Sequence, residues 1–125
     1  IGFPTDATID FQKNILYFCD TRNNVIRSID LNTNIISRIA GVASVNGRFF
    51  GENISALNAS FNDPFSIAFS NFLNCLFISD TNNQRVRKID LSNGLIVTVI
   101  GNGSQGFSNN QIDLNPLQTM LNFPR

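Results

Sequence analysis

Carboxylate and guanidinium groups that recur at regular positions are the side chains of this chain best suited to chemistry. Three pairs lie sixty residues apart: Asp20 with Asp80, Asp30 with Asp90, and Arg27 with Arg87. Such carboxylates could act as general acids or bases or bind calcium, and the guanidinium groups could bind an anion. Each group occurs once per repeat, so every repeat would need its own reaction or ligand. A structural role is therefore favoured for all six.

The segments that follow these first aspartates read as tight turns between strands. Asp20-Thr21 and Asp80-Thr81 each end an apolar run, and a short carboxylate there can accept backbone N–H bonds across the turn. Asn23 and Asn83 suit a left-handed backbone conformation in that turn. For Arg27 and Arg87, the sequence favours a paired charge or a hydrogen bond to the neighbouring unit.

Composition removes several classes of function. The sequence has no histidine, which excludes imidazole catalysis and histidine-ligated metal sites in these 125 residues. Nine Lys plus Arg balance nine Asp plus Glu, so the basic surface of a nucleic-acid-binding protein is not expected. The longest aliphatic run, 95–100, is far shorter than the roughly 20 residues of a membrane-spanning helix. The chain opens Ile-Gly-Phe-Pro without a leader pattern, which is typical of a mature fragment or an excised segment.

Two segments resemble signatures of ligand-binding sites but do not match those signatures fully. Residues 101–106 spell G-x-G-x-x-G, yet no helical periodicity follows, so a dinucleotide site is not expected. Residues 30–41 begin like a calcium loop, but Ile35 stands where that loop requires glycine and Gly41 where it requires glutamate. The same stretch instead predicts a turn in which Asn34, or Gly94 in the second copy, adopts a positive φ. No cofactor is expected.

The chain is an internal repeat with a period of sixty residues. Pro4, Pro64 and Pro124 mark the period, and residues 16–41 align with 76–101 without a gap at ten identities in 26. Two repeats, 1–60 and 61–120, and the start of a third, 121–125, fill the chain. A fixed period of this length indicates a repeat architecture.

Short apolar runs rich in β-branched and aromatic residues predict four strands in each repeat. The expected strands are 5–10, 15–19, 25–31 and 35–40, then 65–69, 75–79, 85–91 and 95–100. Short connections make each repeat an antiparallel meander, and apolar residues on both of its faces require a neighbour on each side. The sequence therefore predicts an all-β protein made of two β-propeller blades. The connections 41–63 and 101–123 are long, with short helical turns expected at 56–59 and 116–120.

The turn segments, 20–30 (DTRNNVIRSID) and 80–90 (DTNNQRVRKID), closely resemble the signature of NHL-repeat β-propellers. Residues 100–108 and 121–125 are similar to the glycine-rich connection and the proline-initiated strand of that family. The resemblance implies a ring of about six blades. Two blades cannot close such a ring, so either this is a piece of a larger propeller, the favoured interpretation, or three copies assemble.

Cys19 and Cys75 occupy different positions of the repeat. Two buried free thiols are favoured, and a disulfide stays open. Asn53, Asn58 and Asn102 each begin an N-glycosylation motif, but 19 Asn with 18 Ser plus Thr give about three such motifs by chance. The compartment, including an extracellular one, is therefore not determined.

The resemblance allows several functions, and the favoured one is a non-catalytic platform that binds a protein through its inter-blade connections. Arg48, Phe49 and Phe50 form the candidate contact with a partner or an adjacent blade. The alternative is part of a propeller hydrolase or lyase with a metal in the central channel, whose catalytic groups lie mostly outside this segment.

Overall fold

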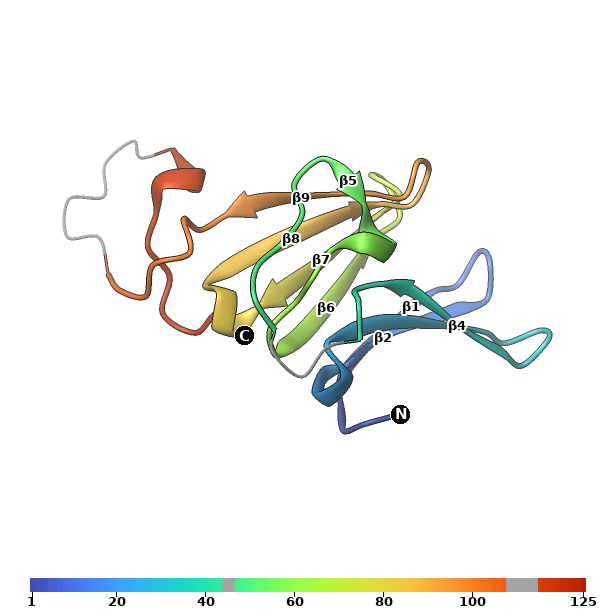
Figure 1. Ribbon diagram of the computed structural model, residues 1–125. Helices are drawn as coiled ribbons and strands as arrows, with labels where there is room; N and C mark the ends of the chain where they lie inside the picture. The colour runs from blue at the N-terminus through green and yellow to red at the C-terminus, as the bar shows by residue number, and fades with distance from the viewer. Residues whose placement is uncertain (44–46, 108–114) are drawn as a thin grey trace.

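The computed structural model describes residues 1–43, 47–107 and 115–125, which form two separate antiparallel sheets (Figure 1). Blade 1 has the order β1-β2-β3-β4, with bounds Pro4–Asp10, Ile15–Asp20, Val25–Asp30 and Ile35–Ala40. Blade 2 has the order β5-β9-β8-β7-β6, with bounds Ile54–Ser55, Leu95–Ile100, Arg85–Asp90, Cys75–Asp80 and Pro64–Ser70. All eight expected strands are present, with ends displaced by at most one residue.

The hydrophobic core lies between the two sheets rather than within either. One face of β2 and β3 packs against the face of β6, β7 and β8 that is turned toward blade 1, and residues of the first connection close the outer side. The buried members of this core are Tyr17, Cys19, Ile26, Ala40, Ala56, Ala59, Phe61, Ile67, Leu76, Ile78, Ile89 and Ile96. Because each sheet hides one apolar face of the other, face-to-face stacking is the main source of stability here.

A fifth strand, β5, joins blade 2 and was not expected from the sequence. Ile54 and Ser55 pair antiparallel with Ile96 and Leu95 of β9, so the first connection (41–63) reaches the outer edge of blade 2 before it enters β6. Two residues are too few to produce a readable periodicity. A segment that belongs to the first sequence repeat thus completes the sheet of the second.

The predicted helical turns within the connections are confirmed as 3₁₀ turns, η2 (Ala56–Asn58) and η4 (Pro116–Gln118). Equivalent backbone bonds tie both of them to the end of the preceding blade: Gly41 N donates to Ala56 O at 2.9 Å, and Gly101 N donates to Pro116 O at 3.0 Å. The described parts of the two connections therefore leave their blades in the same way.

Glycine is required where each outer strand ends. Gly41 and Gly101 have φ of 87° and 97°, and a Cβ atom would lie 2.5 Å from Asn24 O and 2.2 Å from Gln84 O respectively. A side chain at either position would meet rigid backbone as well as an unfavourable left-handed conformation. This accounts for the glycine that both repeats carry at this position.

A 3₁₀ turn joins β2 to β3 and another joins β7 to β8: these are η1 (Thr21–Asn23) and η3 (Thr81–Asn83). The expected left-handed conformation of Asn23 and Asn83 is wrong, because it falls one residue later, on Asn24 and Gln84 with φ of 54° and 53°. The three-residue 3₁₀ turn takes in the predicted asparagine and shifts the reversal onward. The predicted positive φ of Asn34 and Gly94 is confirmed at 58° and 72°.

The two sheets together are a partial β-propeller. β1 and β6 are the most closely opposed strands of the two blades, as expected of inner strands, and the outer strands diverge (Figure 1). Blade 1 uses the face that carries Tyr17 and Cys19 against blade 2, which leaves its opposite face uncovered. No helix in the described ranges is long and apolar enough to cross a membrane.

Both cysteines are free and buried, which confirms the favoured interpretation. Burial raises the pKa of the Cys19 thiol to about 12, with a further contribution from the charge of Asp6. We expect native protein to react with a thiol reagent at pH 8 far more slowly than protein in denaturant, because neither access nor thiolate is available. Absorbance after addition of Ellman's reagent measures this, and rapid reaction of one native thiol would contradict it.

Candidate functional site

The signature residues of blade 1 meet at the carboxylate of Asp20, which is fully buried. Its Oδ1 accepts a hydrogen bond from Gly2 N at 2.6 Å. Its Oδ2 accepts from Asn23 Nδ2 at 3.0 Å and from Arg27 Nε at 2.6 Å. The backbone donor, Gly2 N, precedes the inner strand, whereas the sequence had suggested a backbone donor across the turn. Asp20 therefore fastens three separate segments of the blade.

Blade 2 repeats this arrangement at Asp80. Asn62 N donates to its Oδ1 at 2.8 Å, and Asn83 Nδ2 lies 3.0 Å from both oxygens. Arg87 Nη1 is 3.6 Å from Oδ2, so this is an ion pair without a short hydrogen bond. Every carboxylate oxygen at the two positions thus has a donor from the same blade.

The threonine of each signature connects one blade to the next. Thr21 Oγ1 donates to Pro64 O at 2.8 Å, and Thr81 Oγ1 donates to Pro124 O at the same distance. The second bond involves the start of the third repeat, which therefore joins blade 2 as Pro64 joins blade 1. We refer to these contacts as the threonine latches.

A second inter-blade contact was missed by sequence reasoning. Asp63 N donates to Asn24 Oδ1, and Phe123 N donates to Gln84 Oε1, both at 2.8 Å. The two acceptors differ in residue type, so a search for identical residues passes over them. The detectable signal was chemical, because both repeats carry a carboxamide at the residue that takes the left-handed conformation.

Asp30 and Asp90 lie away from these contacts, at the turns between the third and fourth strands. Asp30 Oδ1 accepts from the backbone N of Asn32 at 2.8 Å, and Asp90 Oδ1 accepts from that of Ser92 at 2.8 Å. Both carboxylates therefore stabilise their own turns. In the described part of the chain, no three acidic or cysteine side chains are grouped closely enough to hold a metal ion.

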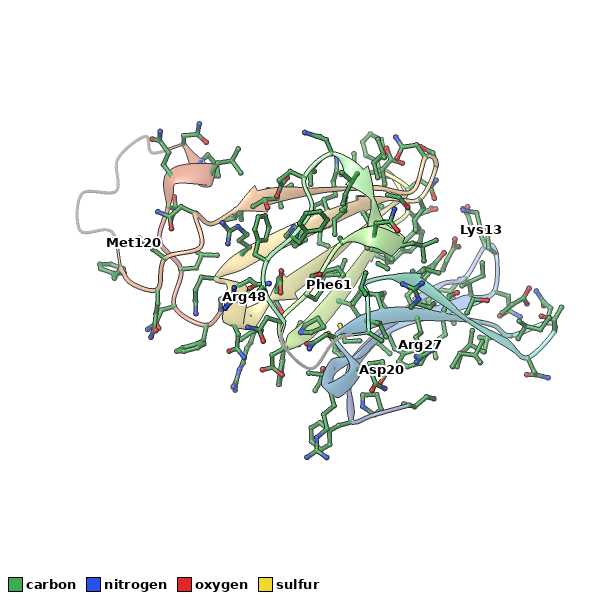
Figure 2. The ribbon with its side chains drawn as sticks, viewed as in Figure 1. Lys13, Asp20, Arg27, Arg48, Phe61 and Met120 are labelled. Atoms are coloured by element: carbon green, nitrogen blue, oxygen red, sulfur yellow. The ribbon has the colours of Figure 1, made fainter. Side chains whose placement is uncertain are left out.

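The two signature arginines differ sharply in burial. The Arg27 side chain is 26% exposed, whereas that of Arg87 is completely buried (Figure 2 labels Arg27 and Asp20). Arg27 faces the uncovered side of blade 1. The equivalent side of blade 2 is covered by blade 1 and by the first connection, which places Arg87 in the interior. Burial accordingly lowers the pKa of Arg87 and raises the pKa of Asp80.

Three residues of the first connection hold it against Arg87 and its neighbours. The Phe49 ring centroid lies 3.8 Å from the guanidinium carbon of Arg85 and 4.8 Å from that of Arg87. Glu52, the single glutamate of the sequence, accepts from Thr98 N at 2.9 Å and lies 3.7 Å from Arg87 Nη2. Gly51 O accepts a hydrogen bond from Arg87 Nη2. Stacking and charge therefore fix this connection to blade 2.

The three residues of the candidate partner contact, Arg48, Phe49 and Phe50, have different surroundings in the structure. Phe49 is half-buried against blade 2, so its contact is with the adjacent blade. Arg48 and Phe50 stay exposed, and the Phe50 side chain keeps 61% of its surface accessible. A partner contact by these two residues stays a prediction. No sequence signal distinguished Phe49 from Phe50, because the difference arises from two arginines more than thirty residues away.

Acid should weaken blade 1 through Asp20. Burial opposes the charge of Asp20, but hydrogen bonds from Asn23, Arg27 and Gly2 outweigh it and hold the pKa below its ordinary value. The stabilisation is thus complete above the unfolded pKa of about 4 and is lost as pH falls toward the folded value. We expect Asp20→Asn to be less stable than the natural chain at pH 7, with the gap narrowing below about pH 4. Urea unfolding at several pH values tests this, and a gap independent of pH would contradict it.

Comparison with known proteins finds the same repeat elsewhere. No family model matches the sequence. NHL repeat-containing protein 2 is 35% identical to it over 106 residues in Gallus gallus and 36% identical over 107 residues in Bos taurus, in each case across 83% of this chain. Protein SUPPRESSOR OF QUENCHING 1, chloroplastic, of Arabidopsis thaliana is 33% identical over 85% of the chain. The chain spans only 10–13% of the length of these relatives.

The solved structures give the same fold. A structural genomics protein of unknown function from Bacteroides thetaiotaomicron matches 97% of this chain with a TM-score of 0.72 at 22% identity, and the chain covers 28% of it. That likeness concerns the fold alone. Together with the doubled signature and the curated relatives, it leads to one assignment. The chain belongs to the NHL-repeat proteins, and its two repeats form neighbouring blades of a β-propeller.

Proposed function

We propose that the chain is part of a non-catalytic propeller platform that binds a protein partner through its inter-blade connections. The observation that carries this proposal is the rigid display of Phe50. Its neighbours on either side, Phe49 and Gly51, contact the buried arginine region of blade 2, while Phe50 itself projects with most of its ring exposed. An apolar side chain held in place before binding loses little conformational entropy when a partner covers it.

The use of the signature side chains supports the same proposal. Asp20 and Asp80 are committed to bonds within their blades, and the two threonines to bonds between blades. Recognition then falls to groups outside the signature, and the connections carry most of the variation between the repeats. In the second connection Phe107 is exposed as well.

The uncovered face of blade 1 supports the placement within a larger ring. A cavity of about 500 Å³ lies on it, lined by residues that include Leu16, Phe18 and Ile29. Their counterparts in blade 2, Leu76, Ile78 and Ile89, are buried under blade 1. Leu16 and Ile29 are only half-buried here, so a further blade over them would bury the same kind of surface in the same way.

The test uses surface substitutions, because removing the first connection would also remove β5 and the cover of Arg87. A partner captured on the immobilised chain and identified by mass spectrometry is purified, and its Kd is measured for the natural chain and for Arg48→Ser/Phe50→Ser. We expect the double variant to weaken binding by about tenfold or more. Ile35→Ser, in β4 outside both connections and as exposed as Phe50 at 61%, is the matched control. Unchanged affinity of the double variant would overturn the role of the first connection.

A further inference from the structure

The end of the blades opposite the threonine latches carries two exposed phenylalanines. Phe11 follows β1 and is 84% exposed, and Phe72 follows β6 and is 95% exposed. Both lie in the hairpin that joins the first two strands of a blade. Lys13 Nζ donates to Asn74 Oδ1 at 3.1 Å and so links the two hairpins. Figure 2 shows Lys13 at this end of blade 1, far from Asp20.

A pocket of about 250 Å³ opens between these hairpins, and we call it the tip pocket. Its lining consists of Ile9, Asp10, Phe11, Gln12, Phe69 and Asn71. Half of these residues are apolar or aromatic, and only one of the other three carries a carboxylate. The Asp10 residue is 1% exposed, which makes it one of the few buried charges in the chain.

The turn does not need the charge of Asp10. Its Oδ1 accepts from the backbone N of Gln12 at 3.0 Å and of Lys13 at 3.1 Å. At the equivalent position of blade 2, the neutral Ser70 makes one of these two bonds, because its Oγ accepts from Leu73 N at 3.3 Å. A hydroxyl group is therefore sufficient to cap this hairpin.

The second carboxylate oxygen of Asp10, Oδ2, already lies near a cation. Lys13 Nζ lies 3.6 Å from Asp10 Oδ2, beyond the range of a good hydrogen bond, and its side chain is 53% exposed. Burial, with a further contribution from the nearby charge of Asp10, raises the pKa of Tyr17. A half-exposed lysine at this distance is a partner that a better-placed cation can displace.

We propose that the tip pocket binds the guanidinium group of an arginine side chain presented by a protein partner; this rests on the proposed function only in that the ligand belongs to a protein. A guanidinium group can bond to a carboxylate and stack on an aromatic ring at the same time, which an ammonium group does less well. The pocket offers Asp10 for the first contact and Phe11 for the second. The chain itself uses such stacking where Arg85 lies over Phe49.

The experiment follows backbone amide signals of the full chain by NMR while acetyl-arginine amide is added, with the uncharged acetyl-citrulline amide as the matched ligand. We expect saturable shifts confined to residues 9–13 and 69–72, with little response to citrulline. Asp10→Asn keeps an oxygen for the turn and removes the charge, and should weaken binding by about tenfold or more. Lys13→Gln removes the competing cation and should strengthen binding by about threefold. Asp30→Asn, which alters a similar turn outside the pocket, should change nothing.

Equal binding by Asp10→Asn and the natural chain, or an equal loss in Asp30→Asn, would overturn the proposal, because it would show non-specific attraction. Tighter binding of acetyl-lysine amide than of acetyl-arginine amide would overturn the choice of guanidinium. The outcome is independent of the proposed function. Partner binding that depends on Phe50 can survive a tip pocket without affinity, and arginine binding at the pocket can survive a first connection without a partner.

Discussion

Replacing Asp80 with alanine is expected to remove about 3–5 kcal/mol from the free energy of unfolding. The substitution leaves the buried guanidinium of Arg87 without its closest carboxylate and leaves Asn62 N without an acceptor. Arg87 Nε and Nη1 have no hydrogen-bond partner among the described residues even in the natural chain, so little can compensate for the loss. Urea unfolding followed by far-ultraviolet circular dichroism measures the change.

Two further variants separate the charge effect from general damage. Asp20→Ala removes the same group from blade 1, and its cost should be smaller because the 26% exposed Arg27 can turn to water. Asp80→Ala/Arg87→Met removes both charges and should be more stable than Asp80→Ala alone, since losing a whole buried pair costs less than losing half of it. Equal losses for Asp80→Ala and Asp20→Ala would show that the burial of the arginine does not matter.

Replacing Phe61 with alanine is expected to lower the free energy of unfolding by about 3–5 kcal/mol. The ring is fully buried where the first connection enters the space between the blades, and Figure 2 labels it there. It belongs to the inter-blade core, lies 6.0 Å from the guanidinium carbon of Arg87, and would touch a Cβ placed on Gly41. A cavity at this point would loosen both blades.

Phe50 supplies the matched control for that prediction. It is the same residue type in the same connection, but its side chain is 61% exposed, so Phe50→Ala should change the free energy of unfolding by less than about 0.5 kcal/mol. Thermal unfolding of both variants under one set of conditions makes the comparison. A loss for Phe50→Ala as large as for Phe61→Ala would mean that burial in the inter-blade core does not set the cost.

The elements that recur were predictable from the sequence because repetition exposes them. Two copies of the same strand pattern averaged out local ambiguity, and the eight main strands were found with small errors at their ends. The shared identity of Asp20 with Asp80 likewise favoured a structural role, and each carboxylate accepts a backbone hydrogen bond from the segment that precedes the inner strand of its blade. Where one copy alone carries a feature, no such comparison helps.

The features missed by the sequence depend on contacts between distant segments. Strand β5 exists because β9 offers an open edge to Ile54 and Ser55, and those two residues carry no strand signal of their own. Phe49 is anchored and Phe50 is free only because Arg85 and Arg87 lie on one side of the connection. The difference between Asp10 and Ser70 was visible in the alignment. Its meaning required knowing that the first is buried beside a pocket and that the second caps the same turn.

Because β5 pairs with β9, the segment that forms the sheet of blade 2 is offset from the sixty-residue sequence repeat. The sequence repeats divide at residues 60 and 61, just before the inner strand β6, whereas the sheet of blade 2 begins at Ile54, in the tail of the preceding repeat. Cutting the gene between codons 60 and 61 would strip the outer edge of that sheet and uncover Arg87. A segment that starts near Gly47 and ends after Ile100 keeps Phe49, Glu52 and β5 with the strands that they protect. Shuffling of such modules should therefore succeed at breakpoints inside the connections rather than at the boundaries of the sequence repeat.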